Sequence, residues 1–240
     1  MHTQSVDSPP RPSDRRSATR WAGVLALCSA LLLALVAVRY HPLMTLDGEI
    51  AETTHRWAVA ESGLTQTFRI LTDWVWDPWT MRILCAVVVL WLLRRHAARW
   101  TALWLALTTT LGTALQQGLK AAVDRARPVW PDPVDSAHYA AFPSGHAMTA
   151  TVVCGLLLYL LHRHGASPAL WRTAVAVAVV SVLGVGLTRV WLGVHWATDV
   201  VGGWLLGAAL VAAAVAVHHR RWPGGPDADP VFPRGRSSAP

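Results

Sequence analysis

Long apolar runs separated by short polar segments form the main hydrophobic pattern of this 240-residue chain. A helix needs about 20 apolar residues to cross the hydrocarbon layer of a membrane. Runs of this kind occupy residues 21–38, 80–93, 100–119, 147–161, 170–187 and 200–217. The second and fourth are short, so we expect their helices to include flanking residues such as Trp79 and Ser144. The pattern predicts an all-α, polytopic membrane protein, with residues 21–221 folded as a six-transmembrane-helix bundle.

The first run has a second interpretation, because Arg15 and Arg16 before an apolar stretch resemble a cleaved export signal. The run is long for a signal core, and no clear small-x-small cleavage site follows it before Arg39. A retained membrane helix is therefore the favoured interpretation.

Three further segments are more polar than the apolar runs. Residues 1–20 and 222–240 are rich in Pro, Ser, Gly and Arg, so we expect two disordered cytoplasmic tails. Residues 43–77 carry apolar side chains at helical spacing, namely Trp57, Ala60, Leu64, Phe68 and Leu71. This stripe predicts an amphipathic helix that packs on the outer surface of the protein.

The composition agrees with a membrane protein, since 53% hydrophobic and 15% charged residues leave too few polar side chains to cover a soluble globule. A net charge of +7 could indicate nucleic-acid binding, but the charges are divided along the chain. Arginines cluster in residues 11–20, 94–99, 163–172 and 220–221, and acids in residues 47–77 and 124–135. We expect the protein to lie in the plasma membrane. The positive-inside tendency then places both termini in the cytoplasm. We expect membrane lipids as neighbours and no nucleic-acid partner.

Three polar clusters interrupt the apolar pattern at helix ends. They are KAAVDRARP at 120–128, PSGH at 143–146 and TRVWLGVHWATD at 188–199. By the predicted topology all three reach the outer face of the membrane. A single Lys or Arg at a helix end commonly snorkels to the interface, but three converging clusters indicate a site.

The clusters contain groups that suit a phosphate. Lys120, Arg127 and Arg189 supply positive charge, Ser144 supplies a hydroxyl, and Gly145 supplies a backbone N–H at a helix N-terminus. No cluster has the spacing of metal ligands, so we expect neither a metal nor a cofactor.

The first cluster should not be helical throughout. A proline disfavours the helical conformation of the residue before it, and Pro128 follows Arg127. We therefore expect the helix to unwind between Lys120 and Arg127.

Two histidines add chemistry to this binding set. His195 and Asp199 are four residues apart at the start of the sixth helix, so the carboxylate can fix the imidazole tautomer and leave the other nitrogen free to attack phosphorus. His146 can protonate the leaving alkoxide as a general acid.

The motifs Lys-x6-Arg-Pro, Pro-Ser-Gly-His and Thr-Arg-x5-His-x3-Asp, in this order, resemble the three signature motifs of the type 2 phosphatidic acid phosphatase (lipid phosphate phosphatase) family. The resemblance covers roughly residues 75–217. One position departs from the family pattern, because Thr188 stands where Ser is usual before the third-motif arginine.

Members of that family are six-helix membrane enzymes that hydrolyse lipid phosphates without a metal, through a phosphohistidine. The resemblance implies phosphate binding by Lys120, Arg127, Ser144, Gly145 and Arg189, with His146 as acid, His195 as nucleophile and Asp199 as its orienting partner. The family also contains soluble vanadium-dependent haloperoxidases, against which the membrane runs argue.

Two other functions are compatible with parts of the pattern. A phosphotransferase would use the same intermediate and pass the phosphoryl group to another alcohol. A transporter or structural membrane protein would explain the apolar runs but not the clustered motifs. For a phosphatase, the candidate substrates are phosphomonoesters or pyrophosphates of an isoprenoid or glycerolipid, among them undecaprenyl pyrophosphate, phosphatidic acid and phosphatidylglycerol phosphate.

Overall fold

The computed structural model describes residues 12–95 and 98–221, and within these ranges it is helical and contains no strand. The elements are α1 (Pro12–Ala37), α2 (His41–Ala60), α3 (Ser62–Ile70), the π-helical turn η1 (Leu71–Val75), α4 (Pro78–Arg95), α5 (Arg99–Val123), α6 (Gly145–Arg163), α7 (Pro168–Trp191) and α8 (Ala197–Arg221). The all-α prediction is confirmed.

Each of the six predicted runs lies in a long helix of its own; these helices are α1, α4, α5, α6, α7 and α8. Helix α4 begins at Pro78 and Ser144 is the N-cap of α6, so both short runs extend as expected. Within residues 12–95 and 98–221, five helical stretches are long and apolar enough to cross a membrane, namely Ser17–Ala37 of α1, the continuous stretch Ser62–Arg94, α6, α7 and α8. Helix α5 packs against α4 and α6 but is not among these stretches. The protein is thus a multi-pass membrane protein, while the exact count of six spans stays a prediction.

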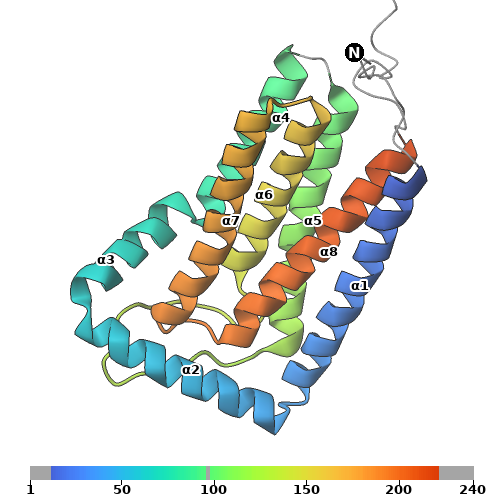
Figure 1. The fold of residues 1–240 in the computed structure, drawn as a ribbon. Coiled ribbons are helices and arrows are strands. Elements are labelled where there is room, and N and C mark those ends of the chain that lie inside the picture. Colours follow the sequence, from blue (N-terminus) through green and yellow to red (C-terminus); the bar gives the residue numbers. More distant parts are fainter. Residues whose placement is uncertain (1–11, 96–97, 222–240) are drawn as a thin grey trace, which may run out of the picture.

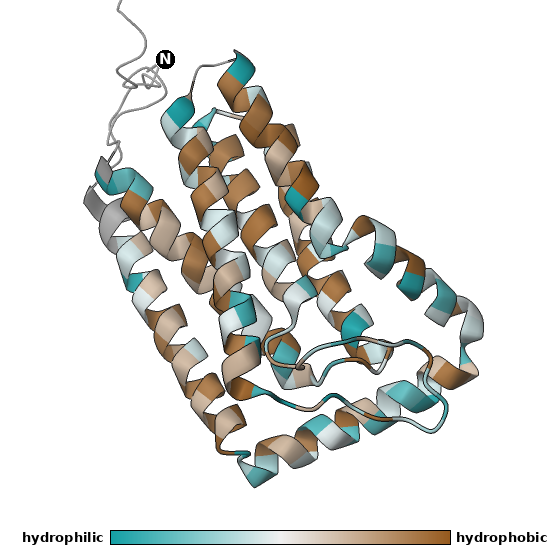
Figure 2. Ribbon diagram, turned by 180° about the vertical axis from the view of Figure 1, so that it is seen from behind, coloured by the Kyte–Doolittle hydropathy of each residue, from teal (hydrophilic) through white to brown (hydrophobic). Residues whose placement is uncertain are grey.

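Helix α6 occupies the middle of the bundle and packs against α4, α5, α7 and α8, whereas α1 lies along α8 (Figure 1). Apolar side chains of α4 to α8 form one buried cluster that includes Leu92, Leu105, Leu156 and Val185. The outward surfaces of the long helices are also largely apolar (Figure 2), as expected of helices that face lipid. This packing fixes the helix ends at which the polar clusters lie.

Helix α2 crosses one end of the bundle, opposite the start of α1 and the end of α8 (Figure 1). Segment 43–77 is helical as predicted, but it breaks at Glu61 into α2 and α3 rather than forming one helix. The predicted packing stripe is wrong for Trp57, Ala60 and Leu64, which are exposed, whereas Phe68 and Leu71 are half-buried and pack against Trp191 and the apolar cluster, respectively. Helix α2 buries another face, which consists of Asp47, Ala51, His55 and Ala58, because polar side chains on that face bind the loops beneath it.

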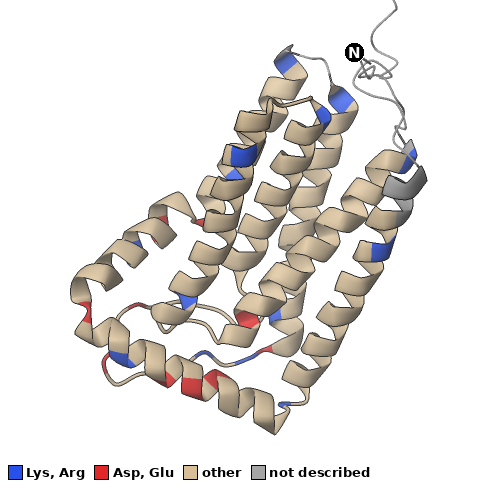
Figure 3. Ribbon diagram, viewed as in Figure 1, with Lys and Arg blue, Asp and Glu red and all other residues tan. Residues whose placement is uncertain are grey.

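The two ends of the molecule differ in charge, because the acidic residues lie toward the end that α2 covers while Lys and Arg occur at both ends (Figure 3). Arginines such as Arg94 and Arg99 lie at the end that holds the α4–α5 connection, and acidic residues gather on α2 and the adjacent loop. This agrees with the charge partition expected from the sequence, and the assignment of the ends to cytoplasm and exterior stays a prediction. Helix α1 begins at Pro12, inside the predicted 1–20 tail, and residues 1–11 and 222–240 lie outside the described residues.

Candidate active site

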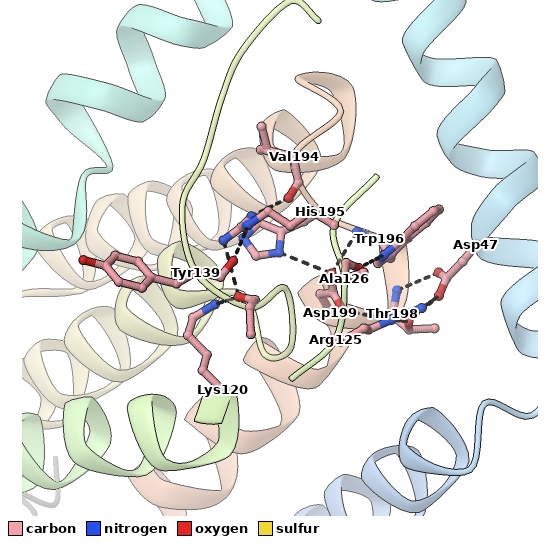
Figure 4. Close-up of polar contacts among 12 residues, drawn as sticks. Asp47, Lys120, Arg125, Ala126, Tyr139, Val194, His195, Trp196, Thr198 and Asp199 are labelled. Atoms are coloured by element: carbon pink, nitrogen blue, oxygen red, sulfur yellow. Dashed lines mark hydrogen bonds and ion pairs between the residues drawn. The ribbon is translucent and has the colours of Figure 1, made fainter. Parts of the chain in front are cut away.

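The three polar clusters meet at the end of the bundle that α2 covers: Figure 4 shows residues of the first and third clusters side by side, and the backbone hydrogen bond from Ser144 to Asp199 brings the second cluster to them. The first comes from the last turn of α5 and the loop after it, the second from the first turn of α6, and the third from the end of α7 through the first turn of α8. Close packing of α6 against α7 and α8 brings these segments together.

Helix α5 ends between Lys120 and Arg127, as expected from Pro128. Its last residue is Val123, and Asp124 adopts a left-handed conformation with φ of 42°. Lys120 therefore stays on the helix, buried, and its Nζ donates to the carbonyl of Ala140. Arg127 lies in the loop, where its Nε donates to the carbonyl of Tyr139 at 2.8 Å. Both cations thus hold the same stretch of the α5–α6 loop.

His195 and Asp199 form a buried pair. The Nδ1 atom of His195 lies 3.3 Å from Oδ2 of Asp199, and the two residues are 2% and 0% exposed. The backbone N–H of Trp196 donates to the same carboxylate oxygen at 2.9 Å. His195 precedes α8, which begins at Ala197, so the expected placement of both residues in the helix is wrong for the histidine. The contact forms nevertheless, and it favours the tautomer that carries its proton on Nδ1.

The other ring nitrogen of His195 faces positive charge. Its Nε2 lies 3.2 Å from Nη1 of Arg127, which can donate only to an unprotonated nitrogen. Burial lowers the pKa of His195 well below its ordinary value, and the neighbouring cations lower it further. The ring is therefore neutral near pH 7, with a lone pair on Nε2.

Ser144 and Gly145 bring the start of α6 against the pair. The backbone N–H of Ser144 donates to the carbonyl of Asp199 at 2.9 Å, while its buried hydroxyl has no hydrogen-bond partner among the described residues. A Cβ on Gly145 would lie 2.6 Å from Nε2 of Gln116 on α5, so any larger residue at this position would have to displace the buried Gln116 side chain.

Arg189 and His146 complete the predicted set. Arg189 is 4% exposed, and its Nη1 lies 3.6 Å from Oδ2 of Asp135. Its buried Nε has no partner among the described residues. His146 is half-buried in the first turn of α6 and lies close enough to His195 and the three cations for electrostatic interaction. Buried donors without partners are rare, so the Ser144 hydroxyl and the Arg189 Nε are suited to an anionic ligand.

The sequence analysis missed three residues of this site. Arg125 donates to Oδ1 of Asp199 at 2.7 Å and to Oδ2 of Asp47 at 2.7 Å, and Thr198 also binds Asp47 (Figure 4). Arg125 lies inside the first motif, where a second arginine beside Arg127 was the available signal. Asp47 gives no such signal, because it lies on α2, far from the motifs in sequence.

Fold and site together define the class: a multi-pass helical membrane protein with cations, a serine and two histidines gathered at one end of its bundle. The family model described as the PAP2 superfamily matches residues 101–223, about half of the chain. The chain therefore belongs to the PAP2 superfamily, and the resemblance drawn from the three motifs is confirmed.

Curated relatives and a solved structure agree with this assignment. Phosphatidylglycerophosphatase B of Bacillus subtilis is 36% identical over 113 residues, which are 46% of this chain and 55% of that protein. An undecaprenyl-diphosphatase of Sulfolobus acidocaldarius is 36% identical over 78 residues, 32% of this chain and 33% of that protein. These alignments thus span about half and a third of the relatives' lengths. The crystal structure of a transmembrane PAP2 type phosphatidylglycerolphosphate phosphatase from Bacillus subtilis matches with a TM-score of 0.72 and 25% identity, covering 83% of this chain and 96% of that one.

Proposed function

We propose that this protein is a metal-independent lipid phosphate phosphatase that works through a phosphohistidine. The observation that carries the proposal is the buried His195–Asp199 contact of 3.3 Å, with Nε2 of the same imidazole turned toward Arg127. A neutral imidazole with one nitrogen held by a carboxylate and the other facing cations is arranged to attack an anionic phosphorus centre.

The phosphoryl group is bound by charge and by hydrogen-bond donors. Arg127, Lys120 and Arg189 neutralise its oxygens, and these cations take the part that a metal plays in other phosphatases. The Ser144 hydroxyl and the N-terminal N–H groups of α6 beginning at Gly145 supply further donors. Buried Arg189 Nε and Ser144 Oγ, for which the part of the chain that the structure describes supplies no hydrogen-bond partner, support this role.

In the first half-reaction a bond forms between Nε2 of His195 and phosphorus as the bond from phosphorus to the ester oxygen breaks. Positive charge develops on the imidazole, and the Asp199 carboxylate stabilises it through the Nδ1 proton. Protonated His146 gives its proton to the leaving oxygen, which departs as the alcohol or, from a pyrophosphate, as the monophosphate.

In the second half-reaction water replaces the alcohol. His146, now neutral, takes a proton from the water as the water oxygen attacks phosphorus. The bond between phosphorus and Nε2 breaks, inorganic phosphate leaves, and His195 returns to its neutral form. A phosphotransferase would differ only in using a second alcohol at this step.

The proposed substrate is a lipid. The site lies at the ends of apolar helices, so a headgroup can reach the cations while its acyl or isoprenoid chain stays in the membrane. The names of the relatives favour phosphatidylglycerophosphate and undecaprenyl diphosphate as the first compounds to test.

The experiment is phosphate release by the purified protein in detergent from phosphatidylglycerophosphate, phosphatidate, undecaprenyl diphosphate and, for comparison, soluble glycerol 3-phosphate. His195→Ala is the inactive control. We expect activity on a lipid that survives EDTA and is inhibited by vanadate, which can mimic five-coordinate phosphorus. Activity lost in EDTA and restored by magnesium would contradict the mechanism. Phosphorylation of an added alcohol in place of phosphate release would identify a transferase.

A further inference from the structure

We propose that Asp47 of α2 is a positioning residue for the His195–Asp199 pair and acts on it through Arg125. The inference rests on the proposed function. It makes α2 part of the active site, although α2 lies outside the three motifs and outside the helices that could span the membrane.

Arg125 is held between two carboxylates. Its Nη1 lies 2.7 Å from Oδ1 of Asp199, and its Nη2 lies 2.7 Å from Oδ2 of Asp47. The guanidinium also lies over the ring of Trp196, 5.5 Å from its centroid. With both ends of the planar group occupied, Arg125 has one orientation, and the Asp199 carboxylate is fixed on the side opposite His195.

Asp47 also binds the start of α8 directly. The backbone N–H of Thr198 donates to Oδ1 of Asp47 at 2.9 Å, and the Thr198 hydroxyl donates to Oδ2. A carboxylate at a helix N-terminus satisfies free N–H groups and interacts favourably with the helix dipole. Asp47 is only 1% exposed, so its negative charge acts with little screening by water.

The charges of this cluster affect the chemistry in opposite ways. The positive charge of Arg125 partly neutralises the Asp199 carboxylate. By itself this would weaken the stabilisation that Asp199 gives to the imidazolium formed when His195 attacks. Asp47 offsets that positive charge. The other charged groups that act on the pair are Lys120, Arg127, Arg189 and His146. Those four residues are unchanged in the variants below. Differences between the variants therefore measure the effect of the Asp47 and Arg125 charges on the His195–Asp199 pair.

The experiment is pre-steady-state labelling with a radiolabelled aryl phosphate across the acid range. Asp47→Asn should slow phosphoenzyme formation about tenfold with KM nearly unchanged, since Asp47 does not touch the substrate. It should also move the acid limb of the rate profile down by about half a pH unit, because loss of a negative charge disfavours protonation of the pair. Arg125→Gln should move the limb up by a similar amount.

The matched control is Glu49→Gln, which removes the same charge from an exposed position of α2 and should leave both rate and limb unchanged. Arg125→Gln leaves the buried carboxylates of Asp47 and Asp199 without their arginine partner and risks misfolding, so a double variant that also carries Asp47→Asn is included. The double variant should restore the position of the limb while the rate stays low.

Different outcomes refute different claims. Limb shifts in the same direction for both single variants, or a shift equal to that of Glu49→Gln, would show that Asp47 acts only by supporting the fold and would overturn the inference. If wild type itself forms no acid-labile phosphoenzyme, the proposed function fails. An active wild type with an unaltered Asp47→Asn variant refutes the role of Asp47 alone.

Discussion

The hydroxyl of Thr72 lies 2.6 Å from the hydroxyl of Thr188, in a buried contact that joins the π-helical turn η1 to the last turns of α7. The Thr188 hydroxyl donates to its own helix at the carbonyl of Val185, 2.8 Å away, so Thr72 is the donor between the two threonines. Thr188 is the position that departs from the family pattern, and the contact needs only a hydroxyl there.

We therefore expect Thr188→Ser to keep phosphatase activity within about twofold, because serine retains both hydrogen bonds. Thr188→Val keeps the shape but leaves Thr72 without its acceptor and should lower the free energy of unfolding by about 1 kcal/mol. Thermal melting in detergent, together with phosphate release, measures both effects. Equal stability of the two variants would contradict a structural role for the hydroxyl contact.

Helices α6 and α8 touch through glycine. A Cβ on Gly203 would lie 2.8 Å from the carbonyl oxygen of Ser144 and 3.0 Å from the backbone nitrogen of Met148. Backbone atoms cannot rotate away, so Gly203→Ala must separate the helices and should cost about 1–3 kcal/mol of stability. Because Ser144 is one of the proposed phosphate-binding residues, displacing its backbone should also lower the rate of phosphate release. Gly118→Ala on the exposed surface of α5, where a Cβ meets nothing within 4 Å, is the control and should leave stability unchanged or slightly higher, because alanine favours a helix more than glycine does. A neutral Gly203→Ala would show that α6 and α8 pack less closely than described.

The two histidines should fail in different ways. His195→Ala should form no phosphoenzyme with any substrate, because no neighbouring group replaces the attacking nitrogen. His146→Ala should fail with lipid phosphates, whose alkoxide needs a proton, yet should still be labelled by an activated aryl phosphate. Since the base for hydrolysis is also missing, acid-labile phosphohistidine should accumulate. Acid-quench labelling of both variants decides the matter: label retained in His195→Ala, or absent from His146→Ala, would reverse or remove these roles.

The environment of His195 predicts the acid side of the pH profile. Its pKa is lowered by burial and by nearby cations, so the imidazole stays unprotonated as the pH falls through the ordinary value of about 6.5. In the His146→Ala variant, the second-order rate of aryl-phosphate labelling should therefore stay level from about pH 7.5 to below 6.5, after correction for the substrate's own titration. Because the unfolded chain binds this proton first, folding stability should decrease below about pH 6.5. A labelling midpoint at the ordinary histidine value would contradict the buried, neutral state.

The charge division predicts the topology. With the site at the outer face, a cysteine introduced at exposed Ser136 in the α5–α6 loop should react with a membrane-impermeant reagent in intact cells. A cysteine at Ala98, beside the arginines at the other end, should react only after the cells are opened. Labelling of Ala98→Cys in intact cells would invert the assignment of the two ends.

The sequence by itself determined the helices and most of the site. Apolar runs near membrane length specify helices locally, since every backbone polar group must be satisfied within the segment. Pro128 disfavours a helical Arg127, and α5 indeed ends before it, at Val123. The four-residue spacing of His195 and Asp199 brought the two residues together even though the histidine precedes the helix. Motif residues were recognisable because each cluster is short and lies at a helix end.

Only the tertiary structure decided what α2 contributes. On α2 the predicted apolar stripe of residues 43–77 pointed to the wrong face, because in a membrane protein apolar side chains such as Trp57 can face outward while a polar face packs inward. Asp47 meets Arg125 and Thr198 across 78 and 151 residues of chain, distances over which no periodicity or spacing carries information. Likewise, the sequence does not show that Gly203 contacts the backbone of α6, because that contact exists only once α8 packs against α6. Such pairings depend on how the helices pack, and that is a property of the whole chain.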